Sequence, residues 1–447
     1  MKNIIQDSSR VFIGTDVPDV YQNPFGANKV YGVVKPINED EVIKAVQFAN
    51  AQNMPIIARG ANTGAAGSQI PVVGGELIID VSLMNKVVEV DLETMTLTVE
   101  PGITLENVQK IADEHGLMYA PDPASKMSSI GGNVSTNAGG MRAIKYGATR
   151  ENVRGLHVVL ADGRKLALGG KTIKDASGYD LLDLFIGSEG TLGITTQVSL
   201  KLVPKPKFNK SMVLAFNDPF TATDTVIEIL KTGILPAALE LFDRESIKFS
   251  ESFLNKKFIS QTGEAYILLT VDGNELTNIN NSLDLIHQIG DKKAIEQIFL
   301  NEKEAVEAWQ MRDSILYGIM NATYFEMLDE VVPINKFADM IRYTKELETK
   351  HGIRVLNFGH SGDGNIHTIM MKDALSDDVW QAKRHAFLDD LYKEVYRLGG
   401  LISAEHGVGY FKREHFLKMT NQDNIHVMKL IKKALDPNNL LNPGKVF

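Results

Sequence analysis

Hydrophobic and polar positions between residues 29 and 100 alternate short β-branched runs with amphipathic helical patterns. Within residues 37–53, Val42, Val46 and Ala49 fall on one helix face, and Asn38 followed by Glu41 is typical of a helix start. This predicted helix leads into a short strand, PIIARG. A second helical run follows Thr104 and ends at Gly116, where glycine adopts the left-handed conformation easily. The alternation predicts an α/β arrangement for this part of the chain.

Further patterns divide the chain into segments. Strands are predicted at 76–81 and 96–102, and residues 156–170 read as a hairpin around an Asp162-Gly163 turn. Pro204 and Pro206 mark a boundary, because closely spaced prolines continue neither a helix nor a central strand. Beyond these prolines, longer helical patterns alternate with strands such as AYILLTVDG. The sequence pattern changes again after residue 400. We therefore predict three parts, at residues 1–205, 206–400 and 401–447.

Composition narrows the class of protein. The 447 residues carry a formal charge of −9 without a basic block, so nucleic acid and anionic membrane surfaces are poor candidate partners. The chain has no cysteine, which excludes disulfides, thiolate metal sites and a cysteinyl flavin bond. No apolar run approaches the ~20 residues needed to span a bilayer. We expect a folded cytoplasmic protein, with a peripheral membrane contact left open.

Three separated segments combine glycine with small polar residues: residues 55–68, 121–147 and 185–194. Glycines let backbone N–H groups approach a diphosphate, although the same residues also make simple surface turns. The spacing is neither a Rossmann fingerprint nor a Walker loop. Three such segments favour one long ligand held between two subdomains, and FAD has that length.

Two histidines and a carboxylate form a second candidate site. His360 and His367 flank the turn GDGN, and an odd spacing on one straight strand would place them on opposite faces. We therefore expect the turn to redirect the chain so that both reach one ion. Histidines alone are more often structural, but SAEHGVG adds Glu405 beside His406. Two histidines and one carboxylate suit Zn²⁺, Mn²⁺ or Fe²⁺.

Taken together, the motifs RGANTG, PDPAS, IGGNVSTNAGG, GSEGTLG, GHSGDGNIH, SAEHGVG and NPGKV resemble one family from about residue 25 to the end. This is the vanillyl-alcohol oxidase and p-cresol methylhydroxylase type of FAD-linked oxidase, in the branch of glycolate oxidase flavin subunits, D-lactate dehydrogenases and D-2-hydroxyglutarate dehydrogenases. The resemblance implies an α+β fold: a two-subdomain FAD-binding domain of the p-cresol methylhydroxylase type, an α+β substrate (cap) domain, and a C-terminal helical segment returning to the flavin.

The resemblance also implies the residues that hold a non-covalent FAD. The diphosphate loop corresponds to Arg59, Gly60, Ala61, Asn62, Thr63 and Gly64. The wall along the ribityl chain and ring corresponds to Pro121, Asp122, Ser129, Gly132, Asn133, Thr136, Asn137, Gly139, Gly140, Tyr146 and Gly147. The adenine side corresponds to Glu189, Gly190 and Ile194, and Asn442 corresponds to the terminal residue that returns to the flavin.

For the reaction, the resemblance implies His360, His367 and Glu405 as metal ligands, with Zn²⁺ placed first, and His406 as the base. Arg312 corresponds to the arginine that binds the substrate carboxylate, although by pattern alone it is a helix surface charge. Where the hydroxyglutarate branch carries a lysine and a threonine, this chain has Met327 and Leu316. Neither can pair with a second carboxylate, so a short D-2-hydroxy acid is expected: D-lactate first, then glycolate.

Two other functions stay open at this point. One is a sugar or alditol oxidase on the same FAD domain, which would lack the metal ligands. The other is a flavin-binding electron-transfer or assembly subunit without a substrate of its own. No segment identifies the electron acceptor, for which an electron-transfer flavoprotein or a quinone is expected, and a homodimer is left open.

Overall fold

The computed structural model describes residues 4–26 and 29–447. Contacts divide the chain into two compact units. The first contains the chain up to Gly139 together with Gly147–Lys205 and Glu405–Phe447. The second contains Gly140–Tyr146 and Pro206–Ala404.

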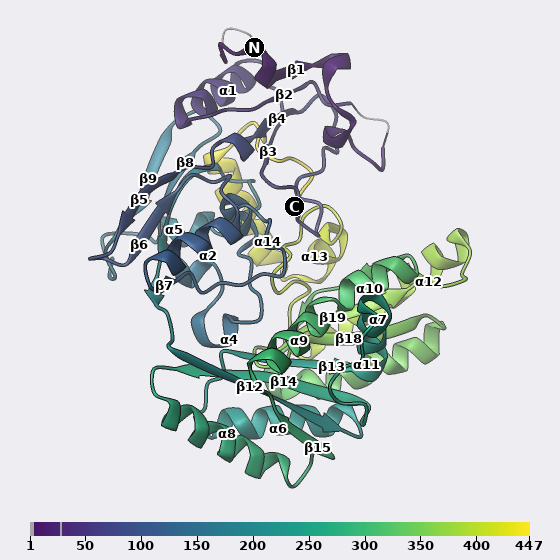
Figure 1. The fold of residues 1–447 in the computed structure, drawn as a ribbon. Coiled ribbons are helices and arrows are strands. Elements are labelled where there is room, and N and C mark those ends of the chain that lie inside the picture. Colours follow the sequence, from purple (N-terminus) through teal and green to yellow (C-terminus); the bar gives the residue numbers. More distant parts are fainter. Residues whose placement is uncertain (1–3, 27–28) are drawn as a thin grey trace. The chain divides into compact units, whose positions relative to one another are not determined.

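The first unit contains a four-stranded sheet near the N-terminus (Figure 1). Its strands run parallel except for the first, which lies at one edge and runs antiparallel to its neighbour. The order is β1 (Val11–Ile13), β2 (Gly32–Val34), β4 (Leu77–Asp80) and β3 (Ile56–Arg59). The predicted strand PIIARG is thus an edge strand of this sheet, and the first glycine-rich loop begins where the strand ends.

A second, antiparallel sheet completes the strand framework of this unit. Its order is β5 (Val87–Asp91), β6 (Thr96–Val99), β10 (Ile194–Lys201), β8 (Val153–Val159) and β9 (Lys165–Gly169). The predicted hairpin is confirmed, because Val159 pairs with Lys165 and Gly163 has a φ of 84°. A short pair, β7 (Leu117–Met118) with β11 (Val203–Pro204), lies apart from both sheets.

The helices of the first unit bear out the predicted starts and stops. Asn38 accepts the N–H of Glu41 at 3.0 Å, and the buried Val42, Val46 and Ala49 enter a core shared by strands of both sheets. The second predicted helix follows its cap Thr104 and ends ahead of Gly116, whose φ is 69°. The helices are α1 (Glu39–Ala51), α2 (Leu105–Glu114), α3 (Ile130–Thr136), α5 (Leu181–Phe185), α13 (Arg413–Met419) and α14 (Gln422–Leu435).

The second unit is built on an eight-stranded antiparallel sheet. The order is β15 (Glu296–Phe299), β12 (Phe208–Phe216), β14 (Ala265–Gly273), β13 (Ala238–Asp243), β18 (Arg354–His360), β19 (Asn365–Met371) and β16 (Phe325–Met327), and β17 (Glu330–Val331) also pairs with β19. The predicted strand AYILLTVDG is β14. The α+β character expected for this region is therefore confirmed.

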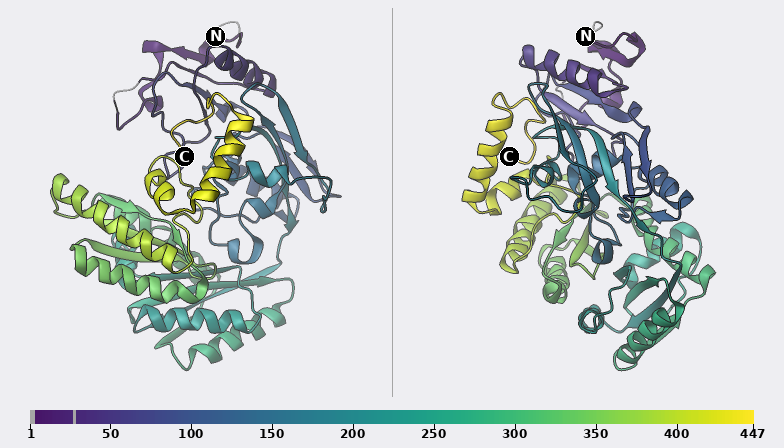
Figure 2. Two further views of the ribbon diagram at one scale, coloured as in Figure 1. Left: turned by 180° about the vertical axis from the view of Figure 1, so that it is seen from behind. Right: turned by 90° about the vertical axis from the view of Figure 1, so that its left-hand side faces the viewer.

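Helices cover both faces of this sheet (Figures 1 and 2). One face packs against α6 (Pro219–Lys231), α8 (Leu276–Gly290) and α11 (Phe337–His351), with α12 (Asp377–Arg397) beside α11. The other face shares a core with α7 (Arg244–Leu254), α9 (Glu302–Asp313) and α10 (Ile315–Ala322). The short helix α4 (Ala143–Tyr146) also belongs to this unit. The second face carries the polar residues considered next.

Candidate functional site

The first glycine-rich loop meets the second at Ser129. The hydroxyl of Ser129 lies 3.3 Å from the backbone nitrogens of both Ala61 and Gly132, and accepts from each. A Cβ on Gly60 would overlap this hydroxyl. Gly60 is therefore required by close approach rather than by a turn. Two predicted cofactor segments thus meet here, through residues that lie 68 apart in the sequence.

Arg59 points away from this loop. Its guanidinium donates to the carbonyl of Val20 at 2.8 Å and lies 4.5 Å from the ring centre of Tyr21. Burial lowers the pKa of Arg59. The side chain thus anchors the end of β3 to the preceding segment, and any contribution of this residue to a cofactor comes from its backbone.

The second segment places a helix start beside the loop. Ser129 caps α3, and the helix ends at Asn137 with a φ of 52°. The first three N–H groups of α3 already have acceptors: the carbonyls of Ile103 at 2.9 Å and Pro101 at 2.8 Å, and the Ser129 hydroxyl. Asn133 is buried, and its Nδ2 has no hydrogen-bond partner among the described residues. A buried donor of this kind fits a polar ligand such as FAD.

The third segment supports the turn after His406. The Glu189 carboxylate accepts the N–H groups of Val408 and Gly409, each at 2.8 Å, and also the hydroxyl of Ser68. A Cβ on Gly407 would lie 2.8 Å from this carboxyl group. Burial raises the pKa of Glu189. The Glu189 side chain therefore links the motifs GSEGTLG and SAEHGVG, which lie far apart in the sequence. The backbone φ of Glu189 is 52°.

Asn442 brings the C-terminal segment to the same place. Its backbone N–H donates to Ile56 at 2.7 Å, and its Nδ2 donates to the carbonyls of Ser68 at 2.9 Å and Glu189 at 2.8 Å. Its Oδ1 is buried and has no partner among the described residues. Together with the Asn133 amide, this acceptor shows that the donor and acceptor set fits FAD.

Left-handed backbone conformations are frequent among the predicted cofactor residues. They occur at Asn62, Asn137, Glu189 and Asn442, none of which is glycine. Such conformations cost about 1–3 kcal/mol each and gather at ligand sites. Gly140, Gly147 and Gly190 also have positive φ values. The backbone is thus shaped locally at the positions where the resemblance implies FAD contacts.

The remaining predicted cofactor residues have varied surroundings. Tyr146 donates its hydroxyl to Asp272 at 2.6 Å, and Ile194 is buried in the α1 core. Asp122 accepts from Gln109 at 2.9 Å. Gly140 and Tyr146 lie in the second unit, whereas all the others lie in the first: Arg59, Gly60, Ala61, Asn62, Thr63, Gly64, Pro121, Asp122, Ser129, Gly132, Asn133, Thr136, Asn137, Gly139, Gly147, Glu189, Gly190, Ile194 and Asn442.

The two histidines of the GDGN turn lie on one sheet face. His360 ends β18 and pairs with Asn365, while His367 on β19 pairs with Phe358. Cross-strand partners share a face, as do residues two apart along a strand, so both imidazoles project to the same side. Their ring centres are 5.3 Å apart. The turn thus redirects the chain, as expected, and that both histidines reach one ion stays a prediction.

A buried glutamate that the sequence did not single out joins His360 to Arg312. Glu240 lies opposite His360 in the pairing of β13 with β18, and its Oε1 is 2.6 Å from His360 Nδ1. Its other oxygen accepts an N–H of Arg312, in the last turn of α9. Burial opposes ionisation, but Arg312 and His360 together lower the pKa of Glu240. Arg312 is only 6% exposed, so it is not a surface charge.

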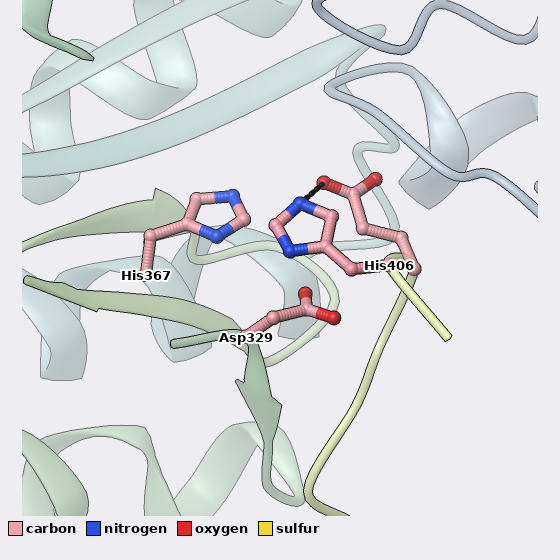
Figure 3. A group of neighbouring side chains, drawn as sticks. Asp329, His367 and His406 are labelled. Atoms are coloured by element: carbon pink, nitrogen blue, oxygen red, sulfur yellow. Dashed lines mark ion pairs between the residues drawn. The ribbon is translucent and has the colours of Figure 1, made fainter. Parts of the chain in front are cut away.

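A group of potential metal ligands contains Asp329, His367, Glu405 and His406, with one ligand atom from each lying within 4.8 Å of the others. Figure 3 shows the side chains of Asp329, His367 and His406 pointing toward one another. Glu405 and His406 directly follow Ala404, whose N–H donates to the Asp329 carboxylate at 3.1 Å. The group holds two of the three predicted ligands and the predicted base, adds Asp329, and does not include His360.

Asp329 is the second residue that sequence reasoning missed. It is fully buried, and its carboxylate accepts from Asn365 at 3.2 Å and from Ser403 at 2.8 Å. It therefore ties the turn between the histidines to the segment that precedes Glu405. The donor set of imidazoles and carboxylates fits a divalent metal ion. The only sequence signal was its position in MLDEVVP, two residues after Met327.

Comparisons with known proteins identify the family to which the chain is similar. The family model described as FAD linked oxidases, C-terminal domain, matches residues 205–446, and the FAD binding domain model matches residues 31–169. No helix in the described part of the chain is long and apolar enough to cross a membrane.

Two relatives that match over nearly the whole chain are named D-lactate dehydrogenase and glycolate oxidase subunit GlcD. The chain is 34% identical to a D-lactate dehydrogenase of Anaerostipes hadrus, covering 98% of this chain and 94% of that protein. It is 36% identical to the glycolate oxidase subunit GlcD of Bacillus subtilis, covering 93% and 88%. The structure of p-cresol methylhydroxylase with substrate bound aligns over 100% of this chain and 95% of that one, with a TM-score of 0.81 at 18% identity. The expected fold is thereby confirmed.

Proposed function

Because the chain belongs to the FAD-linked oxidase family and is an oxidoreductase of the D-lactate dehydrogenase and GlcD type, we propose that it oxidises a small D-2-hydroxy acid to the 2-oxo acid. D-Lactate is the first candidate and glycolate the second. The observation that carries the proposal is the buried arrangement of Arg312, Glu240 and His360 beside His367. It places a cation suited to a carboxylate next to imidazoles suited to a metal.

Cofactor binding is assigned to the residues around Ser129. The backbone N–H groups of the loop at Gly60–Gly64 would hold the diphosphate, while Asn133 and Asn442 would supply a donor and an acceptor. Residues 1–205 would form the FAD-binding part, residues 206–400 the substrate part with metal ligands, and residues 401–447 the return to the flavin. The absence of cysteine makes the cofactor free of a cysteinyl bond.

The metal site is assigned to His360, His367 and Glu405, with Zn²⁺ as the first candidate ion and Mn²⁺ or Fe²⁺ as alternatives. Asp329, which directly precedes β17, supports it through its bonds with Asn365 and Ser403. When bound, FAD supplies a hydride acceptor and the divalent ion supplies the Lewis acidity that lowers the pKa of the substrate hydroxyl. Nitrogen and oxygen donors are the expected ligands, because the chain has no thiolate.

His406 and Arg312 act on the substrate directly in this proposal. A neutral imidazole can accept a hydroxyl proton as a general base, and His406 is assigned that role. The planar guanidinium of Arg312 binds the carboxylate and fixes the orientation of C2. Its pairing with Glu240 restrains the guanidinium before the substrate arrives.

Apolar residues set the substrate length. Met327 on β16 and Leu316 on α10 offer no charge to a second carboxylate, and Met327 packs against the core of the α7, α9 and α10 face. A distal carboxylate would be buried without a partner, which is costly. Short monocarboxylic acids are therefore preferred, and the electrons then pass to an acceptor such as an electron-transfer flavoprotein or a quinone.

Anaerobic reduction of the flavin tests the proposal. Purified FAD-loaded protein is mixed with D-lactate, L-lactate, glycolate or D-2-hydroxyglutarate, and flavin absorbance is followed in a stopped-flow instrument. D-Lactate should bleach the flavin fastest, with glycolate next. Faster reduction by D-2-hydroxyglutarate would show that another cation binds the distal carboxylate, and the absence of reduction by every 2-hydroxy acid would refute the function.

A further inference from the structure

Glu240 occupies the centre of a buried polar group within the second unit. It has no exposed surface, and its two carboxylate oxygens have different partners: Oε1 faces His360 Nδ1 at 2.6 Å, and Oε2 accepts from Arg312. Arg312 and His360 are each 6% exposed. One carboxylate thus connects the residue proposed to bind substrate with a residue proposed to bind metal.

The cross-strand register makes this arrangement specific. Glu240 and His360 are direct partners in the antiparallel pairing of β13 and β18, which brings their Cβ atoms within about 4.5–5.5 Å of each other. A carboxylate beside Nδ1 favours the tautomer that carries its proton on Nδ1. In this tautomer Nε2 carries the lone pair through which an imidazole binds a metal ion.

We propose that Glu240 is a positioning residue that holds His360 in its metal-binding tautomer and Arg312 in its carboxylate-binding orientation at the same time. This inference rests on the proposed function of Arg312 and His360. Glu240 itself touches neither metal nor substrate. Its contribution is to couple the two sites, so that one substitution weakens both.

A purely structural ion pair predicts a different result. Buried ion pairs often stabilise a fold no better than apolar residues of the same size, and a glutamine would then cost stability alone. A glutamine side chain has one acceptor oxygen and one donor nitrogen, so it cannot accept from Arg312 and from His360 Nδ1 together. Either the arginine loses its acceptor or the imidazole changes tautomer.

The same strand offers a matched control. Asp243, three residues further along β13, is also hydrogen-bonded through both oxygens, but its donors are the backbone N–H groups of Ser246 at 2.7 Å and Asn357 at 3.1 Å. It caps α7, and neither of these two donors belongs to a residue assigned to metal or substrate. Asp243→Asn should lower thermal stability and leave the affinity for Zn²⁺ unchanged.

The experiment compares the wild type with Glu240→Gln, Glu240→Asp and Asp243→Asn as FAD-loaded full-length proteins. Each is stripped of metal with a chelator and titrated with Zn²⁺ by equilibrium dialysis, and kcat and KM for D-lactate are measured afterwards. Loss of an outer-shell partner of a metal ligand typically weakens binding about 10- to 100-fold. Glu240→Gln should show that loss together with a raised KM, and Glu240→Asp should fall between it and the wild type.

Several outcomes would overturn the inference: unchanged Zn²⁺ affinity in Glu240→Gln, an equal loss in Asp243→Asn, or a wild type that binds no Zn²⁺. If Glu240→Gln fails to fold, unchanged Zn²⁺ affinity in Glu240→Asp has the same force. The proposed function fails separately, when the wild type binds Zn²⁺ and the variants behave as expected but no 2-hydroxy acid reduces the flavin.

Discussion

Glu189 accepts the backbone N–H of Val408 at 2.8 Å, across 219 residues of sequence. The same carboxylate accepts from Gly409, so one side chain satisfies two consecutive donors in the turn after His406. The glycine-rich segment expected at the adenine end of a flavin therefore also holds the segment that carries the proposed base.

The first prediction follows from these bonds. Glu189→Ala leaves buried N–H groups without an acceptor, at about 1–3 kcal/mol for each unsatisfied group. We expect the free energy of unfolding to fall by about 2–4 kcal/mol and FAD to be released more readily. Urea unfolding and flavin fluorescence after gel filtration measure the two effects. Glu93→Ala, in an exposed turn of the same unit, is the control, and equal behaviour of the two variants would contradict the prediction.

A second prediction concerns Gly60. An alanine Cβ at this position would overlap the Ser129 hydroxyl, so the loop must move away from the start of α3. We expect Gly60→Ala to fold but to lose most of its FAD, and Ser129→Gly in the same protein to restore part of it. The measurement is the ratio of flavin to protein absorbance after dialysis.

Gly273→Ala is the matched control for that experiment, because its Cβ would meet Ile279 only at ordinary contact distance, 3.8 Å. Full retention of FAD by Gly60→Ala would mean that this loop is not part of the cofactor site.

The third prediction concerns the pH dependence of stability. Burial opposes ionisation of Glu251, but hydrogen bonds from Gln261, the Phe258 N–H and Arg244 outweigh it and lower the pKa of Glu251 to about 2. The folded pKa thus lies below the ordinary value of ~4.3. This stabilisation is complete above the unfolded pKa and is lost as the pH falls through the folded pKa.

At neutral pH the lowered pKa of Glu251 contributes roughly 3 kcal/mol to the free energy of unfolding. We expect Glu251→Gln to unfold at lower urea than the wild type at pH 7, with the difference shrinking from about pH 5 downward as the wild-type carboxylate is protonated. Circular dichroism at a series of pH values provides the curves. Glu245→Gln, an exposed position on the same helix, should show no such convergence. A gap between Glu251→Gln and the wild type that stays constant with pH would refute the assignment.

The fourth prediction separates metal binding from proton transfer. His367→Ala should lose the metal and turnover while keeping FAD, whereas His406→Ala should keep both FAD and the metal and lose about 10²–10⁴-fold in turnover. Metal content by atomic absorption, flavin absorbance and the anaerobic reduction rate distinguish the two. Reduction at the wild-type rate in metal-free His367→Ala would favour oxidation by a base and flavin alone.

Local patterns in the sequence were sufficient for the elements around the site. The helix after Asn38, the stop at Gly116 and the hairpin at Gly163 each depend on a few neighbouring residues, and each is present. The common face of His360 and His367 was also predictable, because a short turn between two strands forces it.

Glu240 and Asp329 were not predictable in the same way. Glu240 meets His360 only because β13 lies next to β18, 120 residues away, and no periodicity in ALELFD marks one carboxylate as different. Asp329 gains its role from Asn365 and Ser403 on other segments. The grouping of residues 140–146 with the second unit likewise depends on long-range contacts, such as that of Tyr146 with Asp272.

The bond between Asn442 and Ile56 has a consequence for biosynthesis. The free edge of β3 near the N-terminus is completed by residues 440–442, through the Ile56 N–H to Leu440 and the Asn442 N–H to Ile56, both at 2.7 Å. The ribosome synthesises the chain from the N-terminus onward. All segments of the second unit precede residue 405, so this unit can fold before residues 440–442 are able to pair with β3. The first unit is therefore assembled last although its synthesis begins first, and truncation of only the final residues would leave an open strand edge exposed to aggregation.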